Sequence, residues 1–263
     1  MLPALRLLPV IASVVACLAG PAALADCGAG PGEAGRVGAI VDGDTLTLET
    51  GLTVRLAGIE APKRLVGEAG EGQPSVAAAR AALANLARNQ AVTLHYDTAH
   101  RDRHGRAIAI VRLAGGRVLQ EAMLDQGLAR VHGPVPADCL AVFLGGEQAA
   151  RVAGKGIWRE PQFAVRSADD PSLRTQNGLY EIVEGRVASV GRGTSVVFLN
   201  FGRDRRRDFT VMIATGLARP GGRGEASLES LAGKRIRVRG VIEASGGALI
   251  RLGEWGDIEV LGR

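Results

Sequence analysis

After residue 36 the chain contains short apolar segments of period two that are separated by turn residues. The clearest of these segments are Val37 to Ile40, Leu46 to Leu48 and Thr53 to Leu56. Asp42-Gly43-Asp44 and Thr50-Gly51, which lie between them, are typical turn sequences. Because successive side chains of a strand point to opposite faces, the pattern predicts a β-meander with one buried face. It favours a β-rich barrel over a long helical bundle.

The pattern then changes to a helical period and returns to strands. Apolar residues at helical spacing predict a helix from Ser75 to Asn89, with Ser75 as its N-cap, after a glycine-rich loop. We expect strands over residues 92–96 and 107–113, then helices over 120–126 and 137–153 that glycines end. This α+β order fits a five-stranded OB-type barrel with a helix between its third and fourth strands.

A second, smaller OB-like β-barrel is predicted for residues 178–263. Residues 161–177 are poor in periodic apolar positions and are expected to be a linker. Strand-like segments follow at 182–190, 195–201, 209–213, 235–242, 249–252 and 258–261, with a short helix over 227–231. The predicted domains are therefore a leader at 1–25, an OB-type domain at 34–160, the linker and the second barrel.

Composition supports two β-rich domains and a polyanionic partner. The 263 residues are 46% hydrophobic but only 3% aromatic, with 37 glycines, so the cores must be built from aliphatic residues between tight turns. The formal net charge is +5 and the sequence pI is about 9.6, a balance that favours nucleic acid or an anionic membrane surface.

The N-terminus has the pattern of an export signal. Arg6 supplies a positive charge, Leu7 to Leu18 is an apolar run, and Ala23-Leu24-Ala25 is a small-residue cleavage site. The run is shorter than the roughly 20 apolar residues that a transmembrane helix needs. We therefore expect a secreted or periplasmic protein without a transmembrane segment.

The cysteines leave two interpretations open. Val14-Val15-Ala16-Cys17 also fits a lipoprotein cleavage site, which would place a lipid anchor on Cys17. Cleavage after Ala25 instead leaves Cys27 and Cys139, which an oxidising compartment could join as a disulfide. The second interpretation is favoured, and no zinc site is inferred from the cysteines and histidines.

Four motifs stand in one order across the first domain. They are Val41-Asp42-Gly43-Asp44-Thr45, Val54-Arg55-Leu56-Ala57-Gly58-Ile59-Glu60-Ala61-Pro62, Asp102-Arg103-His104-Gly105-Arg106 and Gln126-Gly127-Leu128-Ala129-Arg130-Val131. In order and spacing they resemble the thermonuclease (staphylococcal nuclease) family, and residues 149–158 resemble the last helix of that family. The resemblance covers roughly residues 34–160.

The resemblance implies a nuclease that hydrolyses phosphodiesters of DNA or RNA with a calcium ion. Asp44 and Glu60 would be calcium ligands, and carboxylate oxygens suit that ion. Arg55 and Arg106 would be the catalytic arginines, because a guanidinium can hold two phosphate oxygens at once. Asp42 is interpreted as a turn residue.

Two positions depart from the family pattern. Glu60 stands where the family usually has an aspartate, and Lys63 stands where it has the catalytic glutamate. An ammonium repels a divalent cation and cannot replace a carboxylate. Lys63 is therefore a phosphate contact in an enzyme with another base, a contact in a binding protein, or a solvated side chain. Glu68 and Glu71 are candidates for a substitute base, although a solvent-facing role is favoured for both.

The residues predicted to contact substrate also differ from the family. His104 stands in the place of a phosphate-contacting tyrosine, and we predict a substrate-binding role for it and for Lys63; an exposed turn histidine is the alternative. After Val131 the chain has His132, where family members stack substrate on tyrosines. The stacking platform is therefore reduced.

In the second domain the basic run over residues 203–208 could follow a nucleic-acid backbone or form a solvated hairpin. Phe198, Phe201 and Phe209 are predicted mostly as core residues.

Two functions follow from these motifs. The first is an exported, calcium-assisted nuclease acting on DNA or RNA. The second is a catalytically silent nucleic-acid-binding or envelope-interaction module that keeps the nuclease fold without its general base.

Overall fold

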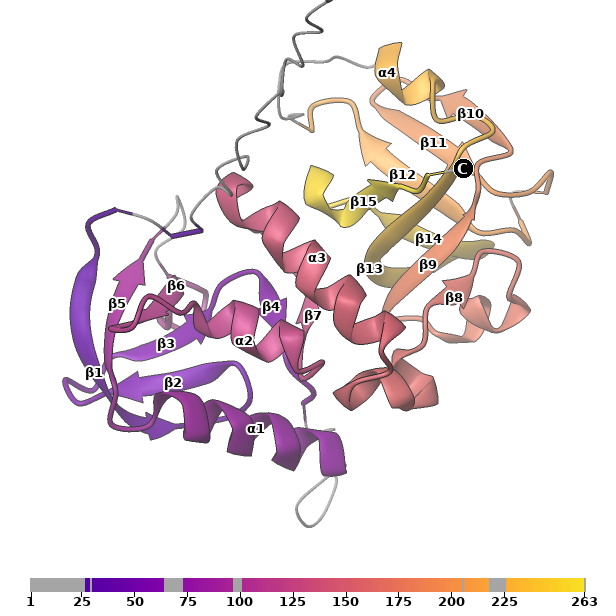
Figure 1. The fold of residues 1–263 in the computed structure, drawn as a ribbon. Coiled ribbons are helices and arrows are strands. Elements are labelled where there is room, and N and C mark those ends of the chain that lie inside the picture. The colour runs from indigo at the N-terminus through magenta and orange to yellow at the C-terminus, as the bar shows by residue number, and fades with distance from the viewer. Residues whose placement is uncertain are drawn as a thin grey trace, which may run out of the picture.

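The computed structural model describes residues 27–28, 30–63, 73–96, 101–204, 206–217 and 226–262. The predicted leader, Cys17, Glu68 and Glu71 lie outside these residues. The chain forms two β-rich units (Figure 1). The first unit contains β1 (Glu33–Ile40), β2 (Thr45–Leu48), β3 (Thr53–Leu56), β4 (Ile59–Glu60), α1 (Pro74–Ala87), β5 (Ala91–His95), β6 (Ala107–Leu113), α2 (Leu119–Asp125), β7 (Arg130–Val131) and α3 (Ala137–Val152).

The first unit is a closed five-stranded barrel of order β1-β2-β3-β6-β5, as the sequence predicts for an OB-type fold. Strand β1 closes it by pairing with two neighbours: residues 33–36 pair with β5 and residues 37–40 with β2. The register shifts between Val37 and Ala39, and such an irregularity lets one strand bend from one partner to the other. Strands β3 and β6 are parallel.

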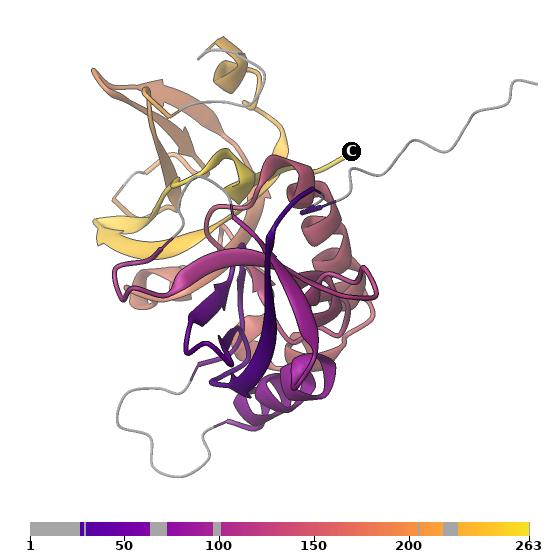
Figure 2. The same ribbon diagram turned by 90° about the vertical axis from the view of Figure 1, so that its left-hand side faces the viewer.

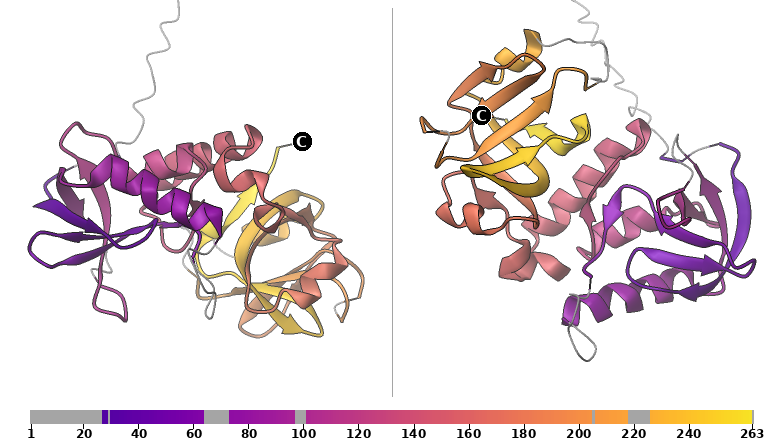
Figure 3. Two further views of the ribbon diagram at one scale, coloured as in Figure 1. Left: turned by 90° about the horizontal axis from the view of Figure 1, so that it is seen from below. Right: turned by 180° about the vertical axis from the view of Figure 1, so that it is seen from behind.

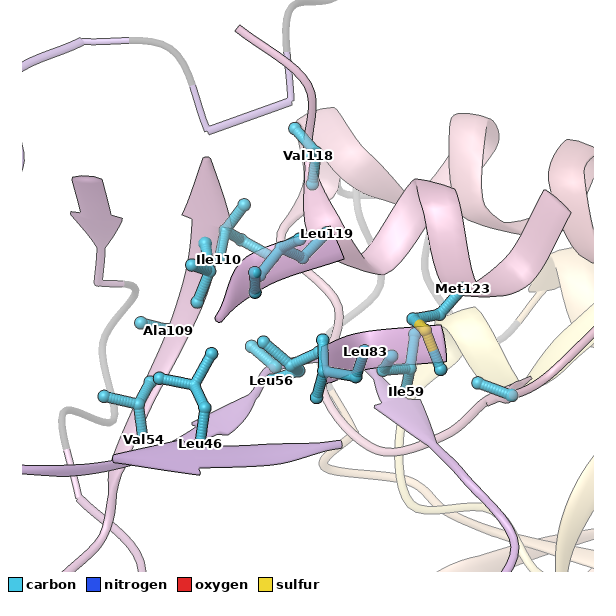
Figure 4. Packing of buried hydrophobic residues seen from close by; sticks show 14 of the residues in the cluster. Leu46, Val54, Leu56, Ile59, Leu83, Ala109, Ile110, Val118, Leu119 and Met123 are labelled. Atoms are coloured by element: carbon cyan, nitrogen blue, oxygen red, sulfur yellow. The ribbon is translucent and has the colours of Figure 1, made fainter. Parts of the chain in front are cut away.

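Aliphatic side chains fill this barrel, as its low aromatic content requires. Figure 4 shows Leu46, Val54 and Leu56 from the strands packing toward Leu83 of α1 and Leu119 of α2. All five side chains are buried. Helix α1 begins one residue before the predicted cap: Pro74 takes its first turn after Gln73, and the buried Ser75 hydroxyl donates to Glu160 instead of capping.

The second unit follows the same strand path. It contains β8 (Arg166–Ser167), β9 (Tyr180–Arg186), β10 (Ser189–Arg192), β11 (Val196–Asn200), β12 (Thr210–Ala214), α4 (Ala226–Glu229), β13 (Arg235–Ser245), β14 (Gly247–Arg251) and β15 (Ile258–Val260). The sheet order is β10-β11-β12-β14-β13-β9-β8, and β15 also pairs with β13. Strands β12 and β14 are parallel, as β3 and β6 are in the first unit.

The two ends of this path are consecutive in the chain, because only Val187 and Ala188 separate β9 from β10. Val187 donates to Lys234 beside β13, and Ala188 donates to Asn200 of β11. The chain bends at Val187 and Ala188, so that β9 pairs with β13 before the bend and β10 pairs with β11 after it. Phe201 and Phe209 are buried in the core of this unit, as predicted.

Short elements fill the segment predicted as a linker. Within residues 161–177 these are the 3-10 helices η2 (Pro161–Phe163) and η3 (Pro171–Thr175); η1 (Gly156–Arg159) precedes this segment, and η4 (Trp255–Asp257) lies near the C-terminus. Strand β8 of this segment pairs in parallel with β9, and Leu173 is buried in the second core. The segment thus joins the two units and also contributes to the second.

Helix α3 lies between the two units, which Figures 2 and 3 show from three further directions. Glu147 of α3 contacts Arg239 of β13 in the second unit, and both residues are buried. The Arg239 guanidinium donates to both Glu147 oxygens, at 2.9 and 3.0 Å, and to Glu259 at 2.7 Å. Toward the N-terminus, Cys139 of α3 forms a disulfide with Cys27, a pairing that the sequence left open.

Candidate functional site

The turn before β2 buries one carboxylate at the edge of the barrel. Asp42 Oδ1 accepts from the Asp44 N–H at 3.0 Å, which confirms Asp42 as a turn residue. The turn directs the Asp44 side chain inward, where it is 0% exposed. Its Oδ1 accepts from the Thr45 hydroxyl at 3.0 Å and its Oδ2 accepts from the Ala61 N–H at 2.9 Å. The Asp44 carboxylate is thus fixed from both sides.

Lys63 completes this cluster. Its Nζ lies 2.5 Å from Asp44 Oδ1 and 2.8 Å from Asp42 Oδ2. Burial acts to raise the pKa of the Asp42 carboxyl, but the hydrogen bond and charge of Lys63 outweigh it and lower that pKa. Lys63 Nζ therefore bridges the carboxylates of Asp42 and Asp44. None of the three roles weighed for Lys63 from the sequence included this arrangement.

Glu60, the other predicted metal ligand, faces a cation. Its Oε2 lies 3.8 Å from Arg130 Nη2, across the short β4–β7 pair. Arg130 is held in turn between the rings of Phe163 and Tyr180, at 5.3 and 4.8 Å from their centroids. Within the described part of the chain, no three His, Cys, Asp or Glu side chains gather in a way that could hold a metal ion.

The two predicted catalytic arginines line one cavity of about 460 Å³. Arg55 comes from β3 and lies 4.0 Å from Asp44 Oδ1, while Arg106 lies just before β6. Asp102 orients Arg106 by accepting from its Nε at 2.7 Å. Among the described residues, no hydrogen bond or ion pair involves the two Nη groups of Arg106.

Three histidines (His95, His104 and His132) and a third arginine also line this cavity. Arg103 and His104 lie at its exposed rim, where Arg103 Nε donates to the His104 ring at 3.1 Å. His132 lies deeper, between the cavity and the second unit. Burial lowers the pKa of His132; Glu60 opposes this, and Arg55 and Arg130 add to it. The imidazole is therefore neutral at pH 7 and can donate to or accept from a ligand.

The second unit supplies the outer wall behind His132. The Tyr180 ring packs edge-on against His132 with 4.4 Å between centroids, and its hydroxyl donates to the Val131 carbonyl at 2.9 Å. Glu147 accepts from the Val131 N–H, and Arg239 donates to the Val131 carbonyl. Strand β7 is thus held by the first unit on one side and by the second on the other.

The family comparison agrees with this geometry. Residues 53–160 match the family model described as staphylococcal nuclease homologue. Residues 53–160 are therefore similar to staphylococcal nuclease homologues. That match includes Arg55, Glu60, Lys63 and Arg106, while the second unit lies outside it. No curated protein matches the chain.

The calcium ion typical of this nuclease family does not fit the residues present. Calcium takes 6–8 oxygen ligands at about 2.3–2.6 Å in proteins. Here the oxygens of Asp42 and Asp44 already accept hydrogen bonds from within the protein, and an ammonium stands between the two carboxylates. Glu60 is turned toward Arg130. We therefore assign no step in this domain to a calcium ion.

The structure brings together most of the residues predicted from the sequence. Arg55, Arg106 and His104 share the cavity, whereas Lys63 lies with Asp44 in the neighbouring acidic cluster. Sequence reasoning missed Arg130 and Tyr180. Arg130 stands within a family motif and could have been noticed there, but Tyr180 is brought in only by the packing of the second unit.

The second unit presents a different basic feature. Arg203, Arg206 and Arg207 are exposed in the turn between β11 and β12, while Arg205 lies outside the described residues. This fits either of the two roles considered for the run.

No helix in the described part of the chain is long and apolar enough to cross a membrane.

Proposed function

We propose that the nuclease-family domain binds the phosphodiester backbone of nucleic acid, DNA or RNA, in the cavity of Arg55 and Arg106, and does so without hydrolysing it. The observation that supports this best is the Lys63 bridge, which places an ammonium on the acidic cluster while both arginines stay turned to the cavity. Guanidinium groups bind phosphate oxygens with fixed charge and directed N–H groups.

Electrostatics favour this proposal. The net charge of +5 draws polyanions toward the protein, and the cavity concentrates Arg55, Arg103 and Arg106. The neutral His132 and the exposed His104 add donors without adding negative charge. The cavity therefore offers cations and hydrogen-bond donors to a phosphate, and Asp102, the one carboxylate among the described residues that line it, is paired with Arg106.

A calcium-assisted nuclease is the second candidate, since Arg55 and Arg106 stand at the family's catalytic positions and Arg55 lies 4.0 Å from Asp44. It would need a base other than Lys63.

We also propose that the protein acts outside the cytoplasm, secreted or periplasmic. The export-signal pattern of residues 1–25 and the Cys27–Cys139 disulfide support this location.

Fluorescence anisotropy with labelled single-stranded DNA and RNA, in the presence of chelator, tests the proposal. The Arg55→Ala/Arg106→Ala variant should bind at least about tenfold more weakly, and the salt slope should fall by about 1.4 if two phosphate contacts are lost. Arg117→Ala is the matched control, because Arg117 is exposed beyond the far end of β6, roughly 20 Å from Arg106. Equal binding by the double variant would refute the assignment of the cavity.

The same oligonucleotides, incubated with calcium or chelator and run on a gel, distinguish the two candidates. Intact oligonucleotides under both conditions are expected from the binding module. Calcium-dependent cleavage that disappears in the double variant would establish the nuclease instead.

A further inference from the structure

We propose that the Lys63 ammonium is a tethered cation that takes the place of a metal ion between Asp42 and Asp44, so that this cluster is electrostatically complete without calcium. The proposal concerns the ion chemistry of the cluster and does not depend on nucleic-acid binding. It rests on the contacts of Lys63, on the surroundings of Asp44, and on which basic residue stands at this position.

The contacts of Lys63 are those of a bridging cation. Its Nζ lies 2.5 Å from Asp44 and 2.8 Å from Asp42, close enough to donate to one oxygen of each carboxylate. A calcium ion that ligated both carboxylates would have to displace the ammonium or lie beside it. Two like charges at such a separation repel strongly where the surroundings exclude water. The ammonium and the metal ion are therefore alternatives.

Asp44 needs a cation. Its side chain is 0% exposed, and burying an ionised carboxylate is costly unless opposite charge and hydrogen bonds compensate for the lost water. The Thr45 hydroxyl and the Ala61 N–H supply neutral donors. Arg55 is 4.0 Å away, which leaves Lys63 as the close positive partner.

The choice of lysine is informative because this chain strongly prefers arginine. Its 32 basic residues are 29 arginines and three lysines, Lys63, Lys155 and Lys234. A guanidinium is a broad planar fork, whereas an ammonium is a compact charge with three donors that can rotate. Only the compact group resembles a bound ion in size, and one of the three lysines stands at this position.

Thermal unfolding of the purified protein in calcium and in chelator tests the proposal. The unsubstituted protein should show the same Tm in both, within about 1 °C. Lys63→Glu removes the ammonium and adds a carboxylate, so it should be less stable in chelator. Calcium should then raise the Tm of that variant by about 3 °C or more. Lys234→Glu is the matched control, since it makes the same charge change at an exposed lysine of the second unit and should not respond to calcium.

A calcium titration by calorimetry covers the case in which Lys63→Glu does not fold. The unsubstituted protein should show no binding at millimolar calcium, and Lys63→Ala, which merely vacates the position, should bind the ion. Calcium binding by the unsubstituted protein that is lost in Asp44→Asn would overturn the proposal. So would a failure of every Lys63 variant to respond to calcium. Neither assay involves nucleic acid, so their outcome is separate from that of the binding experiment.

Discussion

The two units follow one strand path but use arginine in opposite ways. In the first unit, Arg55 and Arg106 face a cavity, and no hydrogen bond or ion pair among the described residues involves the Nη groups of Arg106. In the second, Arg237 and Arg239 of β13 lie almost wholly buried against glutamates. Positive charge alone therefore does not locate a binding surface in this protein. Arginines that are buried and paired with glutamates have a structural role, whereas arginines that face the cavity are the candidates for binding a ligand.

The largest expected effect comes from breaking the buried pair between the units. Arg239→Met leaves Glu147 buried without its bidentate partner, and we expect a loss of about 3–5 kcal/mol in the free energy of unfolding. Urea unfolding followed by circular dichroism measures it. The comparison is Arg55→Met, which should cost no more than about 1 kcal/mol because Arg55 only approaches Asp44 to 4.0 Å.

A second substitution checks that charge, and not lost packing, explains the Arg239 result. Arg239→Met/Glu147→Met removes both charges and should recover much of the stability lost in Arg239→Met alone. Similar losses of unfolding free energy in Arg239→Met and Arg55→Met would contradict the view that Arg239 has a structural role and Arg55 does not.

Removal of the disulfide tests whether the two units unfold together. It joins residues 112 positions apart, and the loss of a crosslink over so long a loop costs about 2–4 kcal/mol in typical proteins. Cys27→Ser/Cys139→Ser should therefore lower the stability of the first barrel by about 3 kcal/mol. With Trp158→Phe, Trp255 of the second unit becomes the remaining fluorescent reporter. If the buried ion pairs couple the unfolding of the two units, the Trp255 transition moves as well; an unchanged transition would show that the units unfold independently.

A smaller effect concerns pH. Burial raises the pKa of Asp257 to about 6, against the opposing hydrogen bond of the Glu254 N–H and the charge of Arg239. Because the folded state binds this proton more tightly than the unfolded state, the stabilisation is present below about pH 4 and is lost as pH rises through about 6. Relative to Asp257→Asn, the protein should lose about 1–2 kcal/mol between pH 4 and 7.

Thermal unfolding of the two proteins at several pH values measures this difference, since contributions common to both cancel. A constant difference in stability across that range would contradict the raised pKa of Asp257.

The smallest effect is expected at an exposed ion pair of the second unit. Arg192 lies 2.9 Å from Glu229, but their side chains are 45% and 58% exposed. Water and salt screen such a pair, so Glu229→Gln should change the free energy of unfolding by less than about 0.5 kcal/mol in urea unfolding. A loss above about 1 kcal/mol would show that the burial of an ion pair does not predict its contribution to stability in this unit.

The order of elements was predictable because it depends on local periodicity. The alternation near Val37 and Leu46, the helical spacing before Leu83 and the turn glycines all act within a few residues. The OB-type barrel was predicted from these patterns, whereas the family resemblance depends on the four motifs of the first domain. The helix start was missed by a residue because Pro74 suits a first helical turn better than Ser75 suits a cap.

The site was only partly predictable because long-range packing completes it. Arg55 and Arg106 could be assigned from their motifs. The bridging role of Lys63 could not, since it depends on the chain bringing Ala61 and Pro62 against the Asp42 turn. Tyr180 is 48 residues downstream of His132 and reaches it only through the docking of the second unit.

The Lys63 bridge also changes how this site depends on its surroundings. A bound metal ion exchanges with solvent, so its occupancy follows the supply of that ion and falls in the presence of a competing chelator. A side chain is covalently attached, so its local concentration at the cluster does not depend on the composition of the medium. The cluster should therefore be filled alike in ion-rich and ion-poor media. If Lys63 replaces the metal ion in this way, the state of the cluster does not depend on the calcium concentration.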